Sequence, residues 1–332
     1  MSRALALSLL LLMPGCALLQ SYRPDFDPGK IGGDVAKAVT APNPCKDLRE
    51  YEITPSDEYY LGRAAAAQVV ARYGNDKLLT PDDPLAKYVR RVGNAIATGA
   101  AAHTEDSELE RYAPTPGVKD RAWPMRGYHF LVVDTDTANA HGMPGGFVVV
   151  TTGLIKQTRS EDELGAVLAH EIAHVQRGHG VELVKRALCE DKHKDDEGWK
   201  KVVGRQLAEI PVIGGVITSG VSAAIGSING ALLNGYESDL EVEADKLAVV
   251  FESFAGYGAR SLVPVLQRIP SSGGLFSNHL SASKRIAAVD EVIAREHLTA
   301  AAENAPLRQA RFKAGVAKIA QLSARESGAG GD

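Results

Sequence analysis

The chain of 332 residues carries 37 Lys and Arg against 41 Asp and Glu, which gives a formal net charge of −4 at pH 7. Hydrophobic residues make up 45% and charged residues 23%, the ordinary composition of a folded globular protein. These values exclude a disordered chain and a disulfide-dense miniprotein. The near-neutral balance also argues against a dedicated nucleic-acid-binding protein.

Residues 1–15 have the pattern of a secretory signal peptide. Arg3 precedes an apolar run from Ala4 to Met13, which is too short to span a bilayer. A glycine then precedes Cys16, as in bacterial lipoprotein processing sites. We therefore expect a lipidated Cys16 that anchors the chain to the outer membrane, facing the periplasm, because no acidic residue follows it directly. Ordinary cleavage nearby, which would leave a soluble secreted protein, is the alternative.

Export would place the other two cysteines, Cys45 and Cys189, in an oxidising compartment. We expect them to form a disulfide, and two free thiols are the alternative. Residues 16–45 are rich in Pro, Gly and Asp without a sustained period, which predicts a tether.

The rest of the chain predicts helices with a few strands. The uncharged stretch 210–236 is long enough to span a membrane, but its many Gly, Ser and Asn residues favour a buried or groove-lining helix pair. A capping box is expected at Ser160 and Glu163. The expected helices begin at Pro55, Asp83, Ser160, Glu237 and Ser283, and the expected strands span 128–134 and 146–152.

Residues 170–174 read His-Glu-Ile-Ala-His, an H-E-x-x-H motif on a predicted helix. Residues four apart share a helix face, so the imidazoles of His170 and His174 can bind one zinc ion. Glu171 lies about 100° round the helix, where it can reach a water on that metal as general base. Two unrelated core histidines are the alternative, which the helix prediction and the export signal disfavour.

A catalytic zinc site needs a third protein ligand. The acidic cluster at 236–245 is the richest source. On a helix, Glu241 and Asp245 share a face while Glu243 points elsewhere. Glu241 is therefore a candidate ligand and Asp245 a candidate hydrogen-bond partner of a ligating histidine. From spacing alone, Glu237 remains a rival for Glu241.

The motifs HEIAH at 170–174, ESDLEVEAD at 237–245 and NAHGMPGGFVVVTTGL at 139–154 resemble the zinc metallopeptidase family that includes HtpX, the CAAX prenyl proteases, BepA and LoiP. This gluzincin resemblance implies one zinc ion held by His170, His174 and Glu241, with Asp245 as helper. It implies an α+β, predominantly helical, zincin-like domain. Its small β-sheet would border the active-site cleft with an edge strand.

The resemblance also implies residues around the cleft. His279 is a candidate switch or transition-state residue, although Leu280 replaces a proline of the family pattern. Arg285 either orients substrate or pairs with an acid. Whether His141 faces the cleft is open, and His179 is interpreted as structural because its spacing from His174 turns it away from the metal. An extended peptide would add to the strand residues Gly146, Phe147, Val148, Val149 and Val150.

We therefore expect a signal peptide at 1–15, a lipidated tether at 16–45, a catalytic domain at 46–300 and a C-terminal helix with a disordered tail at 301–332. The predicted function is that of a zinc-dependent endopeptidase of the bacterial envelope that hydrolyses unfolded or misassembled proteins. The alternative is an assembly factor or chaperone with a latent protease site gated by His279. Expected partners are extended polypeptides, a membrane through the lipid anchor and envelope assembly machinery, but no nucleic acid.

Overall fold

The computed structural model describes residues 53–104, 123–194, 236–268, 281–298 and 304–328, together with three single residues at 226, 228 and 230. All of these belong to one compact unit, Asp47–Asp332. The signal peptide, the tether with Cys16 and Cys45, most of the stretch 210–236 and His279 lie outside the described residues. Within the described residues, no helix is long and apolar enough to cross a membrane.

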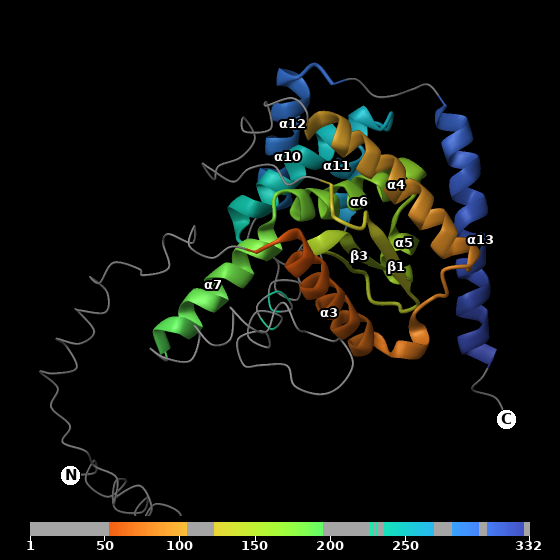
Figure 1. Cartoon of the computed structure of the whole chain (residues 1–332). Helices are drawn as coiled ribbons and strands as arrows, with labels where there is room; N and C mark the ends of the chain where they lie inside the picture. Colours follow the sequence, from red (N-terminus) through yellow and green to blue (C-terminus); the bar gives the residue numbers. More distant parts are fainter. Residues whose placement is uncertain are drawn as a thin grey trace, which may run out of the picture. The chain divides into compact units, whose positions relative to one another are not determined.

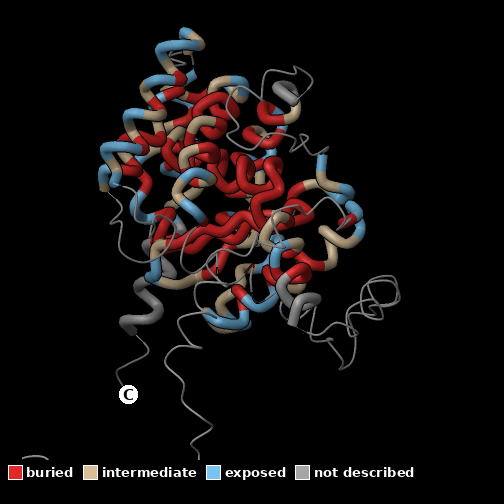
Figure 2. Tube along the Cα trace, turned by 90° about the vertical axis from the view of Figure 1, so that its left-hand side faces the viewer, coloured by how far each residue is buried: buried red, intermediate tan, exposed pale blue. Residues whose placement is uncertain are grey.

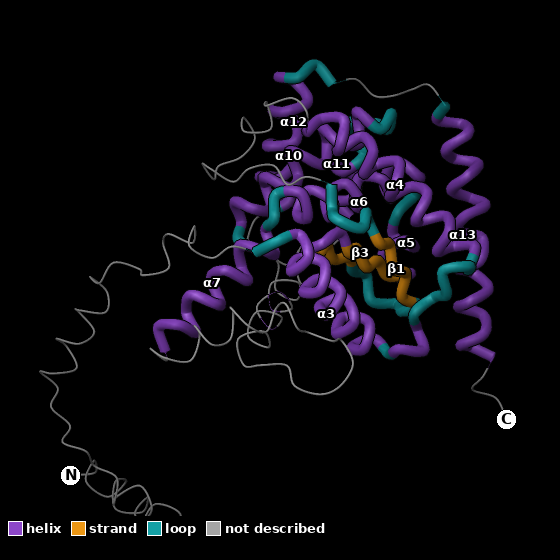
Figure 3. Tube along the Cα trace, viewed as in Figure 1, coloured by secondary structure: helices purple, strands orange, loops and turns teal. Residues whose placement is uncertain are grey.

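Helices surround a small sheet (Figure 1), which confirms the predicted α+β, predominantly helical class. The strands form a small patch among the helices in Figure 3. In chain order the elements are α3 (Pro55–Tyr73), η1 (Asn75–Lys77), α4 (Pro84–Thr104), β1 (His129–Val133), β2 (Ala140–Met143), η3 (Pro144–Gly146), β3 (Phe147–Thr151), α5 (Thr152–Gln157), α6 (Glu161–Gln176), α7 (His179–Lys194), α10 (Ser238–Phe254), α11 (Leu262–Arg268), α12 (Ala282–Arg295) and α13 (Ala305–Gly328).

Local capping sets where the helices begin. Thr54 caps α3 in a capping box with Asp57, in which each side chain accepts a hydrogen bond from the other residue's backbone. Ser160 caps α6 by accepting from the backbone N–H of Glu163 at 3.1 Å. The reciprocal half of that predicted box is shifted, because Glu163 accepts from the backbone N–H of Arg159 instead.

The sheet has three strands in the order β1-β3-β2. Strand β3 pairs in parallel with β1 and antiparallel with β2, so it has a partner on each side. The strand predicted at 146–152 is present, but it is central and is not the expected edge strand. All five residues of β3 are buried, as in other interior strands. The outer strand β2 has only four residues, too few for a clear alternating pattern.

Helix α6 lies at the centre of the core. Every residue from Glu163 to Gln176 is buried, so the helix is enclosed on all sides. It packs against α4, α10 and β2. The buried segments gather in one interior region in Figure 2, with the exposed segments around it. Any polar side chain that α6 carries in this stretch therefore needs a partner from a neighbouring element.

The C-terminal helix α13 packs on the same core as the preceding elements. Phe312 is buried in the hydrophobic core. Arg308 and Arg311 pair with Asp162 and Glu161 in the first turn of α6.

Glu252 of α10 should make folding stability depend on pH. Burial, reinforced by the nearby Asp162 carboxylate, raises the pKa of Glu252 well above its usual value. The folded state then keeps a proton that the unfolded chain releases above about pH 4.5, so stability falls as pH rises through this window. We expect Glu252→Gln to remove this loss, which amounts to about 1.4 kcal/mol per pH unit.

Urea unfolding of wild type and Glu252→Gln at several values between about pH 5 and pH 8 measures this difference. The exposed Glu291 of α12 supplies a control, since Glu291→Gln should leave the pH dependence unchanged. Parallel stability curves for wild type and Glu252→Gln would contradict the prediction.

Candidate metal centre

His170 and His174 bring two imidazole nitrogens to one point inside the core. They lie four residues apart on one face of α6, as their spacing predicts. Their Nε2 atoms are 3.1 Å apart, and their ring centroids are 4.7 Å apart. Both side chains are buried.

The third candidate ligand comes from α10. The Oε2 atom of Glu241 lies 3.4 Å from Nε2 of His170, and its Oε1 lies 3.9 Å from Nε2 of His174. Glu237 stands at the N-cap position of α10, where its exposed carboxylate pairs with Arg186 at 2.8 Å. The tertiary structure thus selects Glu241 over the rival that sequence spacing left open.

These three residues fit a zinc ion. Their ligand atoms all lie within 4.8 Å of one another, and all three side chains are buried. Tetrahedral ligands about 2.0–2.1 Å from zinc are about 3.3 Å apart. The 3.1 Å between the two Nε2 atoms and the 3.4 Å between Nε2 of His170 and Oε2 of Glu241 lie close to that value. Two imidazoles and one carboxylate leave a fourth position open, as in catalytic zinc sites. His170, His174 and Glu241 would therefore hold the metal.

Asp245 orients His170 from the next turn of α10. Its Oδ1 lies 3.0 Å from Nδ1 of His170. Arg285 of α12 donates to both oxygens of this carboxylate, from Nε and Nη2, each at 2.6 Å. Arg285 therefore pairs with an acid, one of the two roles that the sequence left open. Burial lowers the pKa of His170, but the carboxylates of Asp245 and Glu241 outweigh it and raise this pKa to about 9.

Glu171 lies beside the ligands, with one carboxylate oxygen engaged. Its Oε2 accepts a hydrogen bond from the backbone N–H of Gly142 in β2. Its Oε1 is buried and has no hydrogen-bond partner among the described residues. Burial raises the pKa of Glu171 to about 7, with His170 opposing and Glu241 reinforcing the shift. A carboxyl group that titrates near neutrality is suited to accept a proton and return it.

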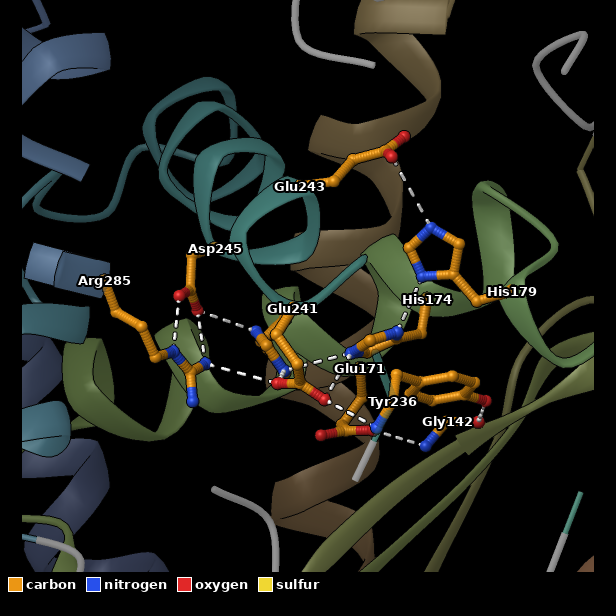
Figure 4. A network of polar contacts seen from close by, with 10 residues as sticks. Gly142, Glu171, His174, His179, Tyr236, Glu241, Glu243, Asp245 and Arg285 are labelled. Carbon is orange, nitrogen blue, oxygen red and sulfur yellow. Dashed lines mark hydrogen bonds and ion pairs between the residues drawn. The ribbon is translucent and has the colours of Figure 1, made fainter. Parts of the chain in front are cut away.

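Strand β2 borders the site, and Gly142 permits its close approach. A Cβ atom at this position would lie 2.3 Å from the backbone oxygen of Glu171. Tyr236 donates from its hydroxyl to the Gly142 carbonyl at 3.5 Å, and its ring stacks on His174 at a centroid distance of 4.2 Å. Figure 4 shows Glu171, Gly142 and Tyr236 gathered beside the ligands. The strand beside the site is therefore β2, and β3 lies one position further in.

Other candidate residues fall elsewhere. His141 of β2 is buried, and burial together with the charge of Arg72 lowers its pKa to about 4, so it is neutral and outside the ligand cluster. Cys189 in α7 is disulfide-bonded. Cys45, its expected partner, lies outside the described residues, so this pairing stays a prediction. The same holds for the lipidation of Cys16 and for the role of His279.

Sequence reasoning missed three contributors to the site. Tyr236 opens the acidic cluster, and Gly142 lies in the matched run before β3, but no pattern marked either of them. His179 was interpreted as turned away from the metal, yet its Nδ1 lies 2.7 Å from Nδ1 of His174. Gly178, a common helix-ending residue, was the available signal.

Comparison with known proteins assigns the chain to a family of metal-dependent peptidases, in agreement with the metal-ligand geometry described above. The sequence profile of Peptidase family M48 matches residues 106–293, which is more than half of the chain. The chain belongs to peptidase family M48. His170, His174 and Glu241 form the candidate zinc site of this M48 metalloendopeptidase chain.

Relatives of this M48 chain include mitochondrial and bacterial proteases. Mitochondrial metalloendopeptidase OMA1 of Schizosaccharomyces pombe is 25% identical over 258 residues, 75% of this chain and 65% of that protein. A β-barrel assembly-enhancing protease of Yersinia pestis is 29% identical over 144 residues, 43% of this chain and 28% of that protein. Metalloprotease YcaL of Escherichia coli is 24% identical over 208 residues, 61% of this chain and 74% of that protein. The chain thus spans under two thirds of the first two relatives.

Removing the Asp245 charge should weaken metal binding. We expect Asp245→Asn to lower zinc affinity by about 10- to 100-fold, because the residue orients His170 and is held by Arg285. Glu237→Gln, on the exposed start of the same helix, is the matched control and should bind zinc as wild type does. Competition with a chromophoric chelator measures both affinities. Unchanged zinc binding by Asp245→Asn, or an equal loss in Glu237→Gln, would contradict the assignment.

Proposed function

We propose that this protein is a zinc-dependent endopeptidase of the bacterial cell envelope that hydrolyses peptide bonds in unfolded or misassembled proteins. The observation that carries the proposal is the Glu171 carboxylate, buried beside three convergent metal-ligand atoms and next to an outer strand of the sheet. A binding protein has no need of a general base at that position. Hydrolysis does, because water must lose a proton as it attacks.

The residues divide the chemistry between them. When bound, zinc supplies a Lewis acid that polarises the scissile carbonyl and activates water. Glu171 accepts the proton of the attacking water and returns it to the leaving amine. Asp245 and Arg285 hold the ring of His170, so that the ligand set is formed before substrate arrives.

We place the substrate along β2. In an antiparallel pair, alternate residues direct their backbone groups away from the partner strand. Gly142 does so, because its N–H meets Glu171 and its carbonyl meets the Tyr236 hydroxyl. Among the described residues, β2 has no strand on that side. An extended peptide could add there by backbone hydrogen bonds, which suits substrates that have lost their fold. The predicted addition of a peptide strand to residues 146–150 does not fit, because β3 is already paired with β1 and β2.

The envelope location rests on the targeting pattern of residues 1–15 and on bacterial relatives. One of these is named for enhancing β-barrel assembly. A lipid on Cys16 would hold the catalytic unit at a membrane through the tether, within reach of proteins assembling there. We therefore expect the substrates to be envelope proteins in extended conformation.

Substitution of Glu171 should separate chemistry from metal binding. We expect wild-type protein to hydrolyse casein and Glu171→Gln to lose at least about 100-fold of that activity, because the general base is removed. Both proteins should hold one zinc ion, measured by elemental analysis. Measurable casein hydrolysis that is equal in the two proteins would refute the assigned role of Glu171.

Burial of the site favours a second candidate function. His170, Glu171, His174 and Glu241 are each at most 2% exposed, and both backbone groups of Gly142 are already engaged. A site in this state must open before a peptide can bind. An assembly factor or chaperone with a latent protease site, gated by His279, would leave both proteins zinc-loaded and neither active. Activity that then appears in His279→Ala would support it.

The lipid anchor can be tested directly. We expect wild-type protein to fractionate with membranes and its mature N-terminal peptide to carry the mass of an acylated cysteine. Cys16→Ser should shift the protein to the soluble fraction while casein hydrolysis is retained, since Cys16 lies outside the catalytic unit. An unmodified mature N-terminus in wild type would refute the anchor and favour secretion.

A further inference from the structure

A second chain of buried polar contacts leads away from the metal ligands. The Nδ1 atom of His174 lies 2.7 Å from Nδ1 of His179. The Nε2 atom of His179 lies 3.8 Å from Oε2 of Glu243, within ion-pair distance. Arg177 donates from Nε to Oε1 of the same Glu243. All four side chains are buried, and Figure 4 shows His179 between His174 and Glu243.

The fold brings His179 back to His174 by ending α6. The helix ends at Gln176, and Gly178 has a φ of +65°, a left-handed conformation that favours glycine. The chain reverses there, and His179 begins α7. Had α6 continued, a residue five positions after His174 would have pointed about 140° away from it.

Metal binding at His174 would determine which nitrogens carry protons. With Nε2 of His174 bound to the metal, the proton of this ring would lie on Nδ1. That N–H would donate to Nδ1 of His179, which would then be the unprotonated nitrogen of the second ring. The proton of His179 would then lie on Nε2, facing the carboxylate of Glu243.

We propose that His179 is a positioning residue that fixes the ring of the metal ligand His174, supported in turn by Glu243 and Arg177. The inference rests on the metal centre of the proposed function. Each of the two ligand histidines would then be oriented by a carboxylate–arginine pair. His170 is held directly by the Asp245–Arg285 pair, and His174 is held by the Glu243–Arg177 pair through one intervening imidazole. Such partners set ring orientation and ligand basicity.

Two variants of similar size isolate the hydrogen bond from the space that the ring fills. His179→Asn places an amide oxygen near the position of Nδ1, where it can accept from His174. His179→Leu removes the acceptor. We expect His179→Leu to lose about 10- to 100-fold in zinc affinity and His179→Asn to retain most of it. Chelator competition measures the affinity, and the absorption spectrum of the Co²⁺-loaded protein should change only in His179→Leu.

Thermal unfolding of the metal-free proteins shows whether each variant is folded. If His179→Leu does not fold, His179→Gln replaces it, because its amide lies beyond the Nδ1 position and cannot restore the bond. His129→Leu is the control, since His129 lies on β1, stacked on Phe147 at a centroid distance of 4.6 Å and outside the ligand cluster. It should bind zinc as wild type does.

Three outcomes overturn the inference. Wild-type zinc affinity in His179→Leu would remove any role for His179 at the metal. Equal losses in His179→Leu and His179→Asn, with equal loss of thermal stability, would show that His179 only fills space. Failure of the wild-type protein to bind zinc would refute the metal centre and the inference with it. This outcome can be told from the other two because it is seen in the wild-type protein, without any substitution.

Discussion

Burial of charged and titratable side chains where α6 packs against α10 is the constraint on which the rest of the structure depends. An isolated carboxylate or imidazole in a dry core is costly, so each needs a partner. Helix α10 supplies Glu241, Glu243 and Asp245, which alternate with Val242 and Ala244. Because α6 is enclosed on all sides, these partners also fix how the two helices pack. The same contacts that pair the charges therefore assemble the metal ligands.

The surrounding elements serve this helix pair. Strand β2 approaches α6 at Gly142 and supplies the backbone N–H that meets Glu171. Helix α12 contributes Arg285, which neutralises Asp245 behind His170. At the opposite end of α6, α13 pairs its arginines with the first-turn acids. The position of α6 is thus fixed from both ends, by β2 and α12 at the metal motif and by α13 at the first turn.

This arrangement bears on how the site can act. Rigid ligands with partnered second nitrogens favour metal binding before substrate. The outward backbone groups of Gly142 in β2, in contrast, are engaged by the side chains of Glu171 and Tyr236. A peptide that binds at Gly142 would exchange those two contacts for hydrogen bonds to its own backbone. Because Glu171 is also the proposed general base, access to β2 and the proposed chemistry depend on the same side chain.

The sequence by itself determined the helix of the metal motif, the shared helix face of Glu241 and Asp245 and the resemblance to a zinc peptidase family. Helical periodicity is a local property, so residues three or four apart share a face wherever the helix lies. Only the tertiary structure decided that β3 is the central strand of the sheet, that Glu237 is not a metal ligand and that His179 contacts His174. Strand order depends on pairing between distant segments, and the reversal at Gly178 depends on where α6 stops, which no periodic pattern specifies.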